Sequence, residues 1–242
     1  GANAGLVLCV ADDPGMHSSQ NEQDSRHYAK AAKVAMLEPS DSAECRDFTK
    51  LAFELSERFD TPVIVRLSTR VSHSQSLVEE HEPDTVALKP YEKNVAKNVM
   101  MPANAIKRHV AVEERAKKLI EYAETTPLNR IEDNGAQIGV ICSGISYMYA
   151  HEALGDKVNY LKLGMAYPMP EMKIRAFAAQ CRRLFVIEEL DPFIEEHCRA
   201  LGVEVTGKSA FTMLGEYTPA MIAEAVLGKK PVWHPEIGEQ IP

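Results

Sequence analysis

Short apolar runs alternate with longer amphipathic segments in the first part of the chain, and this alternation constrains the fold most strongly. Apolar runs at residues 5–10, 34–39 and 62–68 are separated by segments with helical patterns at 20–33 and 41–59. Successive parallel strands need a long crossover connection, which is usually a helix. The order β-α-β-α-β therefore predicts a parallel sheet with helices on its faces.

Two helix starts support this interpretation. Ser19 and Glu22 have the spacing of a capping box, which predicts that a helix begins at Gln20 and continues to about residue 33. Asp41 and Glu44 predict the start of the second helix in the same way. Apolar side chains then recur at helical spacing, at Phe48, Leu51, Ala52, Leu55 and Phe59.

The second part of the chain repeats the alternation after a break. Residues 79–108 contain several lysines and prolines and no strand pattern, and an amphipathic helix follows from Val112 to Ala123. Asp191 and Pro192 predict a helix start, as the N-cap and first helical residue, and Thr218 begins a last helix. Four further strands are expected, at 137–144, 158–164, 183–189 and 203–207.

We therefore expect an α/β protein with two three-layer parallel-sheet units. The expected units are residues 1–78 and 131–228, joined by a linker at 79–130 that contains one amphipathic helix. Residues 229–242 are expected to form an extended connector. The chain enters an apolar strand within a few residues and has no initial methionine, so we expect it to be a fragment of a longer polypeptide.

The composition excludes several classes of protein. With 45% hydrophobic and 26% charged residues, the chain is expected to form a globular fold. The net charge of −8 argues against a nucleic-acid or anionic-membrane surface, and no apolar run is long enough to span a membrane. The five cysteines lack paired spacing, Cys9 and Cys142 lie in apolar strands, and no signal peptide is visible, so reduced buried thiols and a cytoplasmic location are expected.

Polar side chains gather where two of the predicted strands end. Residues 11–26 follow the first strand and include His17, and residues 69–76 follow the third strand and include Arg70 and His73. The carboxyl ends of neighbouring parallel strands open onto one crevice, where open α/β sheets bind ligands. Arg70 is the best candidate to bind a substrate carboxylate, because a guanidinium can bind a carboxylate through two hydrogen bonds. The alternative is a solvated loop and a surface arginine.

The remaining motifs give weaker signals. Residues 141–146, ICSGIS, lack the glycine spacing of dinucleotide and nucleoside triphosphate loops. Residues 188–193, EELDPF, place three carboxylates after a strand, and helix capping and contact between domains explain them. No histidine pair has the spacing of a metal site, so the sequence predicts no metal held by protein ligands alone and assigns no catalytic residue.

Long blocks of the sequence carry a family resemblance. They are ADDPGMHSSQNEQDSRHYAKAAKVAMLEPSDSAE, TPVIVRLSTRVSHS, IGVICSGISY, YLKLGMAYPMPE and FVIEELDPFIEEH. These blocks resemble the large (alpha) subunit of the indolepyruvate ferredoxin oxidoreductases, which belong to the thiamine-diphosphate-dependent 2-oxoacid ferredoxin oxidoreductases. The resemblance covers nearly the whole chain.

The resemblance implies where each part of the chain belongs. Residues 1–78 resemble the later part of the domain that binds the aminopyrimidine ring of thiamine diphosphate, and residues from about 131 resemble a transketolase C-terminal-like domain. The rest of the pyrimidine domain, the domain that holds the diphosphate and Mg²⁺, and the region for iron–sulfur clusters are expected outside this chain. The chain alone is therefore expected to be catalytically incomplete.

The resemblance also implies a reaction and partners. In this family a 2-oxoacid, here expected to be the aryl oxoacid indolepyruvate, is oxidatively decarboxylated to its acyl-coenzyme A. The electrons pass through iron–sulfur clusters to ferredoxin, a smaller (beta) subunit takes part, and a homodimer is expected. Two alternatives stay open: a non-catalytic module for pairing domains within the subunit, and a transketolase-like thiamine enzyme without clusters.

Site residues follow from the resemblance. Arg70 in TRVSH resembles the arginine of the R-T-S-H segment of pyruvate-type relatives, which binds the substrate carboxylate, although Val71 replaces the threonine. His17 and His73 are expected to bind substrate with Arg70. The loop after the first strand is expected to line the site through Asp12, Asp13, Ser18, Gln20 and Gln23.

Overall fold

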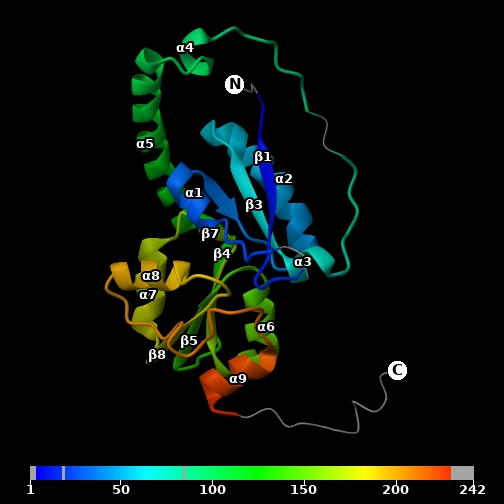
Figure 1. The fold of residues 1–242 in the computed structure, drawn as a ribbon, viewed down its shortest axis with the longest axis vertical. Coiled ribbons are helices and arrows are strands. Elements are labelled where there is room, and N and C mark those ends of the chain that lie inside the picture. The colour runs from blue at the N-terminus through cyan, green and yellow to red at the C-terminus, as the bar shows by residue number, and fades with distance from the viewer. Residues whose placement is uncertain (1–3, 18–19, 84–85, 230–242) are drawn as a thin grey trace.

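The computed structural model describes residues 4–17, 20–83 and 86–229, and within them the strands form two four-stranded sheets (Figure 1). Sheet A has the order β1 (Val7–Asp12), β3 (Val63–Ser68), β2 (Ala35–Leu37) and β7 (Met165–Tyr167). Sheet B has the order β4 (Asn129–Glu132), β6 (Asn159–Leu163), β5 (Ile138–Cys142) and β8 (Arg183–Ile187).

Each sheet consists of three parallel strands and one antiparallel edge strand. In sheet A, β1, β3 and β2 run parallel and β7 pairs with β2 in the opposite direction. In sheet B, β6, β5 and β8 run parallel and β4 is antiparallel to β6. The predicted α/β class is thus confirmed. The sequence pattern predicts neither antiparallel strand, because β7 has three residues and β4 lies in a polar segment that is typical of a turn.

Helices cover both faces of each sheet and make each unit three-layered. Helix α1 (Arg26–Ala32) packs on one face of sheet A, and α2 (Ser42–Phe59) and α5 (Pro102–Thr125) pack on the other. Helices α6 (Gly144–Leu154) and α9 (Pro219–Leu227) cover one face of sheet B, and α7 (Glu171–Gln180) and α8 (Phe193–Ala200) cover the other. A short 3-10 helix, η1 (Gly155–Lys157), follows α6. Among the described residues, no helix has both the length and the apolar character needed to cross a membrane.

The two sheets are joined at Gly164, between β6 and β7. A Cβ atom at this position would lie 2.7 Å from the carbonyl oxygen of Leu128 and 3.0 Å from Cζ of Phe48, so only glycine fits. The buried Asn129 strengthens the junction, since its Nδ2 donates to Ala123 O over 3.0 Å and its Oδ1 accepts from Met165 N over 2.9 Å. Sheet B therefore continues directly into an edge strand of sheet A.

Two predicted helix starts are confirmed by their caps. The Asp41 side chain accepts a hydrogen bond from Glu44 N over 2.8 Å at the start of α2. The Thr218 hydroxyl accepts from Met221 N over 3.3 Å at the start of α9. In both cases the interaction lies within one helical turn, which explains why the sequence alone reveals it.

Other predicted starts are wrong. Helix α1 begins at Arg26 rather than at residue 20, and Ser19 of the expected capping box lies outside the described residues. Glu22 instead accepts a hydrogen bond from Gly215 N over 3.2 Å, so a contact with a distant loop replaces the local cap. Helix α8 begins at Phe193, and Asp191 does not cap it.

The segments between the predicted elements also differ from expectation. Residues 69–76 contain a short helix, α3 (Thr69–His73), where a loop is expected. Residues 203–207 make only an isolated bridge, from Thr206 to Phe185, instead of a fourth strand. Helix α5 begins ten residues earlier than Val112. The sequence pattern did not predict its first turns, because they have no buried apolar face.

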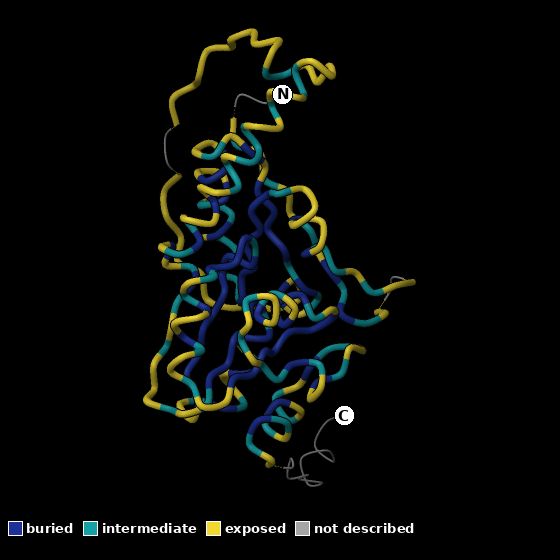
Figure 2. Tube along the Cα trace, turned by 90° about the vertical axis from the view of Figure 1, so that its left-hand side faces the viewer, coloured by how far each residue is buried: buried dark blue, intermediate teal, exposed yellow. Residues whose placement is uncertain are grey.

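The segment before α5 contacts the sheet-A unit at the end of α2, where Lys97 Nζ donates to Asp60 Oδ1 over 2.6 Å. It includes a short helix, α4 (Val95–Asn98), and Figure 2 shows it as a largely exposed arm that arches from α3 to α5. Strand β1 is also less buried than expected, because it forms the edge of sheet A. Leu8 is 53% exposed and Cys9 is exposed, which corrects the expectation of a buried strand with a buried thiol.

Candidate functional site

The two polar segments that follow β1 and β3 lie side by side. Asp12 and Ser68, the last residues of the two strands, are paired in the parallel register. One residue further along, Thr69 Oγ1 donates a hydrogen bond to Asp13 Oδ1 over 2.7 Å. The parallel pairing therefore places Asp13, at the start of the loop after β1, next to α3, which carries Arg70.

A loop from the sheet-B unit meets these segments from the other side. Arg70 donates from Nη2 and Nε to Oε2 of Glu216, over 2.6 and 3.0 Å. The His17 Nε2 atom lies 3.9 Å from Glu216 Oε1, and Glu22 accepts from the backbone of the same loop. We call the set Asp13, His17, Glu22, Arg70 and Glu216 the boundary site.

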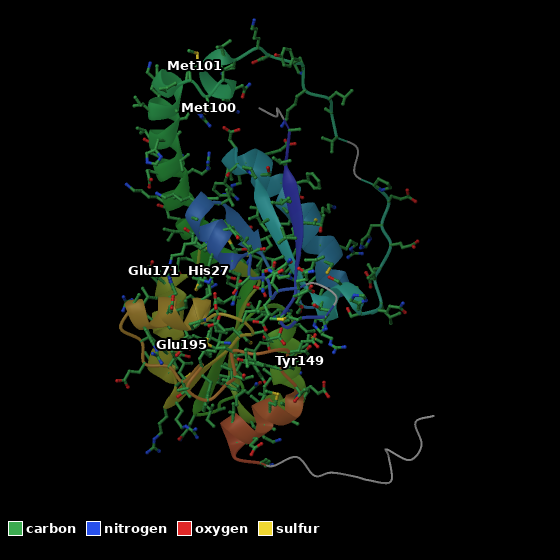
Figure 3. All side chains as sticks on the ribbon, viewed as in Figure 1. His27, Met100, Met101, Tyr149, Glu171 and Glu195 are labelled. Carbon is green, nitrogen blue, oxygen red and sulfur yellow. The ribbon has the colours of Figure 1, made fainter. Side chains whose placement is uncertain are left out.

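A small cleft continues this boundary toward α8. It has a volume of about 370 Å³ and lies between residues 22–24, 190–191 and 213–214. His27 of α1 lies at this side of the boundary, and Tyr149 of α6 lies at the other (Figure 3). The boundary site is thus built from loops of both sheet units.

Two buried arginines anchor the loops beneath the boundary site. Arg66 of β3, 5% exposed, donates to the carboxylates of Asp12 and Glu38. Arg26 of α1, 1% exposed, binds both oxygens of the Asp24 carboxylate, over 2.8 and 2.6 Å. A buried arginine is stable only where carboxylates or carbonyl groups satisfy its donors. The arginines therefore fix both ends of the loop at 13–25.

Two of these charged side chains, Arg26 and Glu38, also form hydrogen bonds from the sheet-A unit to the sheet-B unit. Arg26 Nη1 donates to Glu188 Oε2 over 2.6 Å, and Glu188 also accepts from the backbone N–H groups of Ile194 and Glu195 at the start of α8. Glu38 accepts from Ser143 Oγ over 3.0 Å at the start of α6. Carboxylates are favourable at helix N-termini, where backbone N–H groups are unpaired. The predicted roles of helix capping and domain contact are confirmed for Glu188.

A second buried contact joins the units further from the boundary site. Lys162 of β6, 1% exposed, donates to Ser40 Oγ over 2.6 Å and to Glu44 Oε1 over 2.5 Å. Its ammonium group also lies 4.3 Å from the ring centre of Tyr147. Burial lowers the pKa of Lys162, and the charge of Glu44 opposes that shift. This contact fixes the start of α2 against sheet B.

The carboxyl groups at the boundary have different protonation behaviour. Burial alone would raise the pKa of Asp24, but the hydrogen bonds and charge of Arg26 outweigh burial and hold this pKa below its ordinary value. Burial raises the pKa of Glu189 to about 7, and the charge of Glu216 adds to the shift while a hydrogen bond from Tyr217 N opposes it. Burial also raises the pKa of Tyr149, with the charges of Glu189 and Glu216 adding to the effect. Glu189 is therefore a carboxyl group that titrates near neutral pH.

The structure places the residues named from the sequence at different depths. Asp12 is buried beneath the loop, and Asp13 is partly buried against Thr69. His17, Gln20 and Gln23 are exposed on the loop, and Arg70 and His73 are exposed on α3. Ser18 lies outside the described residues. Of these residues, the boundary site brings together Asp13, His17 and Arg70.

Several residues of the boundary were not recognised from the sequence. Arg66 gives a signal that could have been used, because a single charged residue inside the apolar run VIVRLS requires a buried partner. Glu38 gives the same signal in the apolar run VAMLEP, whereas Arg26 gives none, since its neighbours are polar. Glu216 lies 146 positions from Arg70, and nothing local indicates their pairing.

Among the described residues, one group of side chains is close enough to share a metal ion. It consists of Asp24, His27 and Asp191. Asp24 is already bound by Arg26, and His27 Nε2 lies 3.0 Å from Asp191 Oδ2. These hydrogen bonds account for the group without a metal ion.

The sequence matches one protein family model and several curated proteins. Residues 10–138 match the family described as pyruvate flavodoxin/ferredoxin oxidoreductase, thiamine diphosphate-binding. The chain is 42% identical to indolepyruvate oxidoreductase subunit IorA of Archaeoglobus fulgidus, over 86% of the chain and 34% of that protein. It is 38% identical to the subunit of the same name in Methanothermobacter marburgensis, over 100% of the chain and 43% of that protein. The chain thus spans about two-fifths of the length of such relatives.

Two solved structures share the fold. A 2-oxoglutarate:ferredoxin oxidoreductase from Magnetococcus marinus superposes with a TM-score of 0.60 and 16% identity, covering 91% of this chain and 48% of that one. An inactive tetramer of a split-gene transketolase superposes with a TM-score of 0.51 and 16% identity, covering 92% and 66%. At this level of identity the likeness establishes the fold only.

Proposed function

Since this chain belongs to the pyruvate flavodoxin/ferredoxin oxidoreductase family of thiamine diphosphate-binding proteins, we propose that it forms one wall of a 2-oxoacid site. The reaction that we propose for the complete protein is the oxidative decarboxylation of an aryl 2-oxoacid, indolepyruvate, to its acyl-coenzyme A. The names of the relatives at 42% and 38% identity support this choice of substrate. The chain's own residues contribute to binding the oxoacid.

The observation that carries this proposal is the position of Arg70. It lies on α3 directly after β3, and its side chain is 60% exposed at the boundary site. Glu216 binds the guanidinium through Nε and Nη2 only, and the Arg70 side chain stays largely exposed, so we propose that an incoming carboxylate binds the remaining donors. A guanidinium binds a carboxylate by charge and by two parallel hydrogen bonds. We therefore assign the oxoacid carboxylate to Arg70, with His17 nearby and His73 at the end of α3.

We propose that this chain supplies only part of the cofactor site. A diphosphate with Mg²⁺ needs free carboxylate or carbonyl oxygens around the metal ion. The described group that comes closest to this requirement, Asp24, His27 and Asp191, is already committed to other hydrogen bonds. We propose that the Mg²⁺ and diphosphate site and the iron–sulfur clusters belong to other parts of the complete protein.

The remaining assignments are part of the same proposal. Residues 1–78 would be the later part of the pyrimidine domain, 131–228 the transketolase C-terminal-like domain, and 79–130 and 229–242 connecting segments. Coenzyme A, ferredoxin, a smaller beta subunit and a second copy of the subunit are the proposed partners. All five cysteines are free in the structure, which supports a reducing compartment such as the cytoplasm.

The test is the variant Arg70→Ala in the complete enzyme with its smaller subunit, assayed by 2-oxoacid-dependent reduction of a viologen dye. A hydrogen bond to a charged group contributes about 1.5–3 kcal/mol, so the KM for the oxoacid should rise about 10- to 100-fold. The control is Arg182→Ala, because Arg182 is exposed next to the other end of β8. An unchanged KM in Arg70→Ala would exclude the carboxylate role.

The same preparation distinguishes the two alternative functions. If the subunit were only a module for pairing domains, Arg70→Ala would leave the steady-state kinetics unchanged. If the protein were a transketolase-like enzyme, chemical analysis of the complete protein would find neither iron nor labile sulfide. We expect both iron and sulfide to be present.

A further inference from the structure

The ion pair between Arg70 and Glu216 has a second consequence for the boundary site. Both donors on one edge of the Arg70 guanidinium point to a single oxygen of Glu216, over 3.0 and 2.6 Å. The Glu216 side chain is only 13% exposed, whereas that of Arg70 is 60% exposed. The buried carboxylate therefore anchors the pair, and its two hydrogen bonds orient the exposed arginine.

The other oxygen of Glu216 has no hydrogen-bond partner among the described residues, although it is buried. The His17 ring lies near this oxygen, with its Nε2 atom at 3.9 Å. A buried oxygen that accepts no hydrogen bond leaves part of the carboxylate charge without a donor. Any further anion that approaches Arg70 therefore meets this charge at close range.

Carboxylates outnumber the arginine in the boundary site. The boundary site contains the carboxylates of Asp13, Glu22 and Glu216, and Arg70 is its arginine. The Glu189 carboxyl group also contributes to the environment of Tyr149 beside the pair. Arg70 therefore shares its positive charge between Glu216 and the carboxylate of the oxoacid, and a second carboxylate on the ligand would meet Glu216 without a further arginine of the boundary site to bind it.

From these observations we propose that Glu216 is a specificity-determining residue, which positions Arg70 for one carboxylate and repels a second one. The site would accept 2-oxoacids with an uncharged side chain and discriminate against dicarboxylic 2-oxoacids. This inference rests on the proposed function of Arg70. Repulsion between like charges lowers the affinity of a site for the wrong ligand, and binding sites use such repulsion to gain specificity.

The test compares two substrates in the complete enzyme, phenylpyruvate as an aryl monocarboxylic 2-oxoacid and 2-oxoglutarate as a dicarboxylic one. Glu216→Gln keeps an oxygen that accepts hydrogen bonds from Arg70 but removes the charge. The ratio of kcat/KM for 2-oxoglutarate to that for phenylpyruvate should rise about tenfold, mainly through a lower KM for 2-oxoglutarate. Glu216→Asp keeps the charge and should keep the wild-type ratio.

Two further variants separate the possible results. Glu216→Ala removes the partner that orients Arg70, so the KM should rise for both substrates. Glu196→Gln, on the exposed surface of α8, is the control and should change neither value. An unchanged substrate ratio in Glu216→Gln would overturn the inference. If Glu216→Gln leaves the ratio unchanged but Arg70→Ala raises the KM in the same assay, the inference about Glu216 is wrong and the proposed function stands. If Arg70→Ala has no effect, the inference and the proposed function are both wrong.

Discussion

Replacing Glu189 by glutamine should change how the stability of this protein depends on pH. The Glu189 side chain lies at the end of β8, is 7% exposed, and accepts a hydrogen bond from Tyr217 N over 2.7 Å. Burial raises its pKa from 4.5 to about 7, and the nearby charge of Glu216 adds to the shift. Glutamine has nearly the same shape and keeps the acceptor oxygen, so the substitution removes the titration and little else.

The sign of the effect follows from proton binding. Because the pKa of Glu189 is higher in the folded state than in the unfolded state, the folded state binds more protons between pH 4.5 and 7. The stability contributed by the protonated form is complete below pH 4.5 and is lost as the pH rises through about 7. One pKa unit corresponds to about 1.4 kcal/mol, so the loss amounts to about 3 kcal/mol at pH 8.

The assay is urea-induced unfolding of the wild-type chain and Glu189→Gln at pH 5 and pH 8. Relative to the wild type, the variant should gain about 2.5 kcal/mol in the free energy of unfolding between the two pH values, because a small part of the loss has already occurred at pH 5. Glu196→Gln removes an exposed carboxylate and should follow the wild type. If the difference between Glu189→Gln and the wild type is the same at both pH values, Glu189 does not titrate near neutral pH and the argument from burial is wrong.

Two other substitutions test the packing between the sheets. Arg26→Met leaves the carboxylates of Asp24 and Glu188 buried without their partner. The free energy of unfolding should therefore fall by about 3–5 kcal/mol in a urea titration at pH 7. A loss below about 1 kcal/mol would show that these charges are hydrated. Gly164→Ala brings a Cβ atom within 2.7 Å of the backbone carbonyl of Leu128, and thermal unfolding should show a loss of about 1–3 kcal/mol; an unchanged melting temperature would mean that the junction adjusts freely.

The sequence was informative wherever the stabilising interaction is local. The starts of α2 and α9 depend on Asp41 and Thr218, each of which binds a backbone N–H three residues ahead. The alternation of strands and helices identified the parallel sheets for a similar reason, since each element carries its own apolar pattern. Arg70 could be singled out because it directly follows a recognisable strand.

The sequence was uninformative wherever the stabilising interaction is distant. The start of α1 was misplaced because Glu22 binds Gly215, 193 positions away, instead of capping a helix. Strand β1 was expected to be buried because its residues are apolar, but its position at the sheet edge leaves Leu8 exposed. The partners of the buried arginines are likewise set by the topology, and no spacing in the sequence encodes them.

The buried charges between the sheets explain why the boundary site has one defined geometry. Apolar contacts alone would tolerate small shifts of sheet A against sheet B, because hydrophobic burial is not directional. A shift that separates Arg26 from Glu188, or Lys162 from Glu44, leaves a charge buried without a partner, and that costs several kcal/mol. We infer that these pairs select a single arrangement of the two units rather than maximise stability. The distance between Arg70 and a loop on the other unit is then set by the same pairs that hold the sheets together.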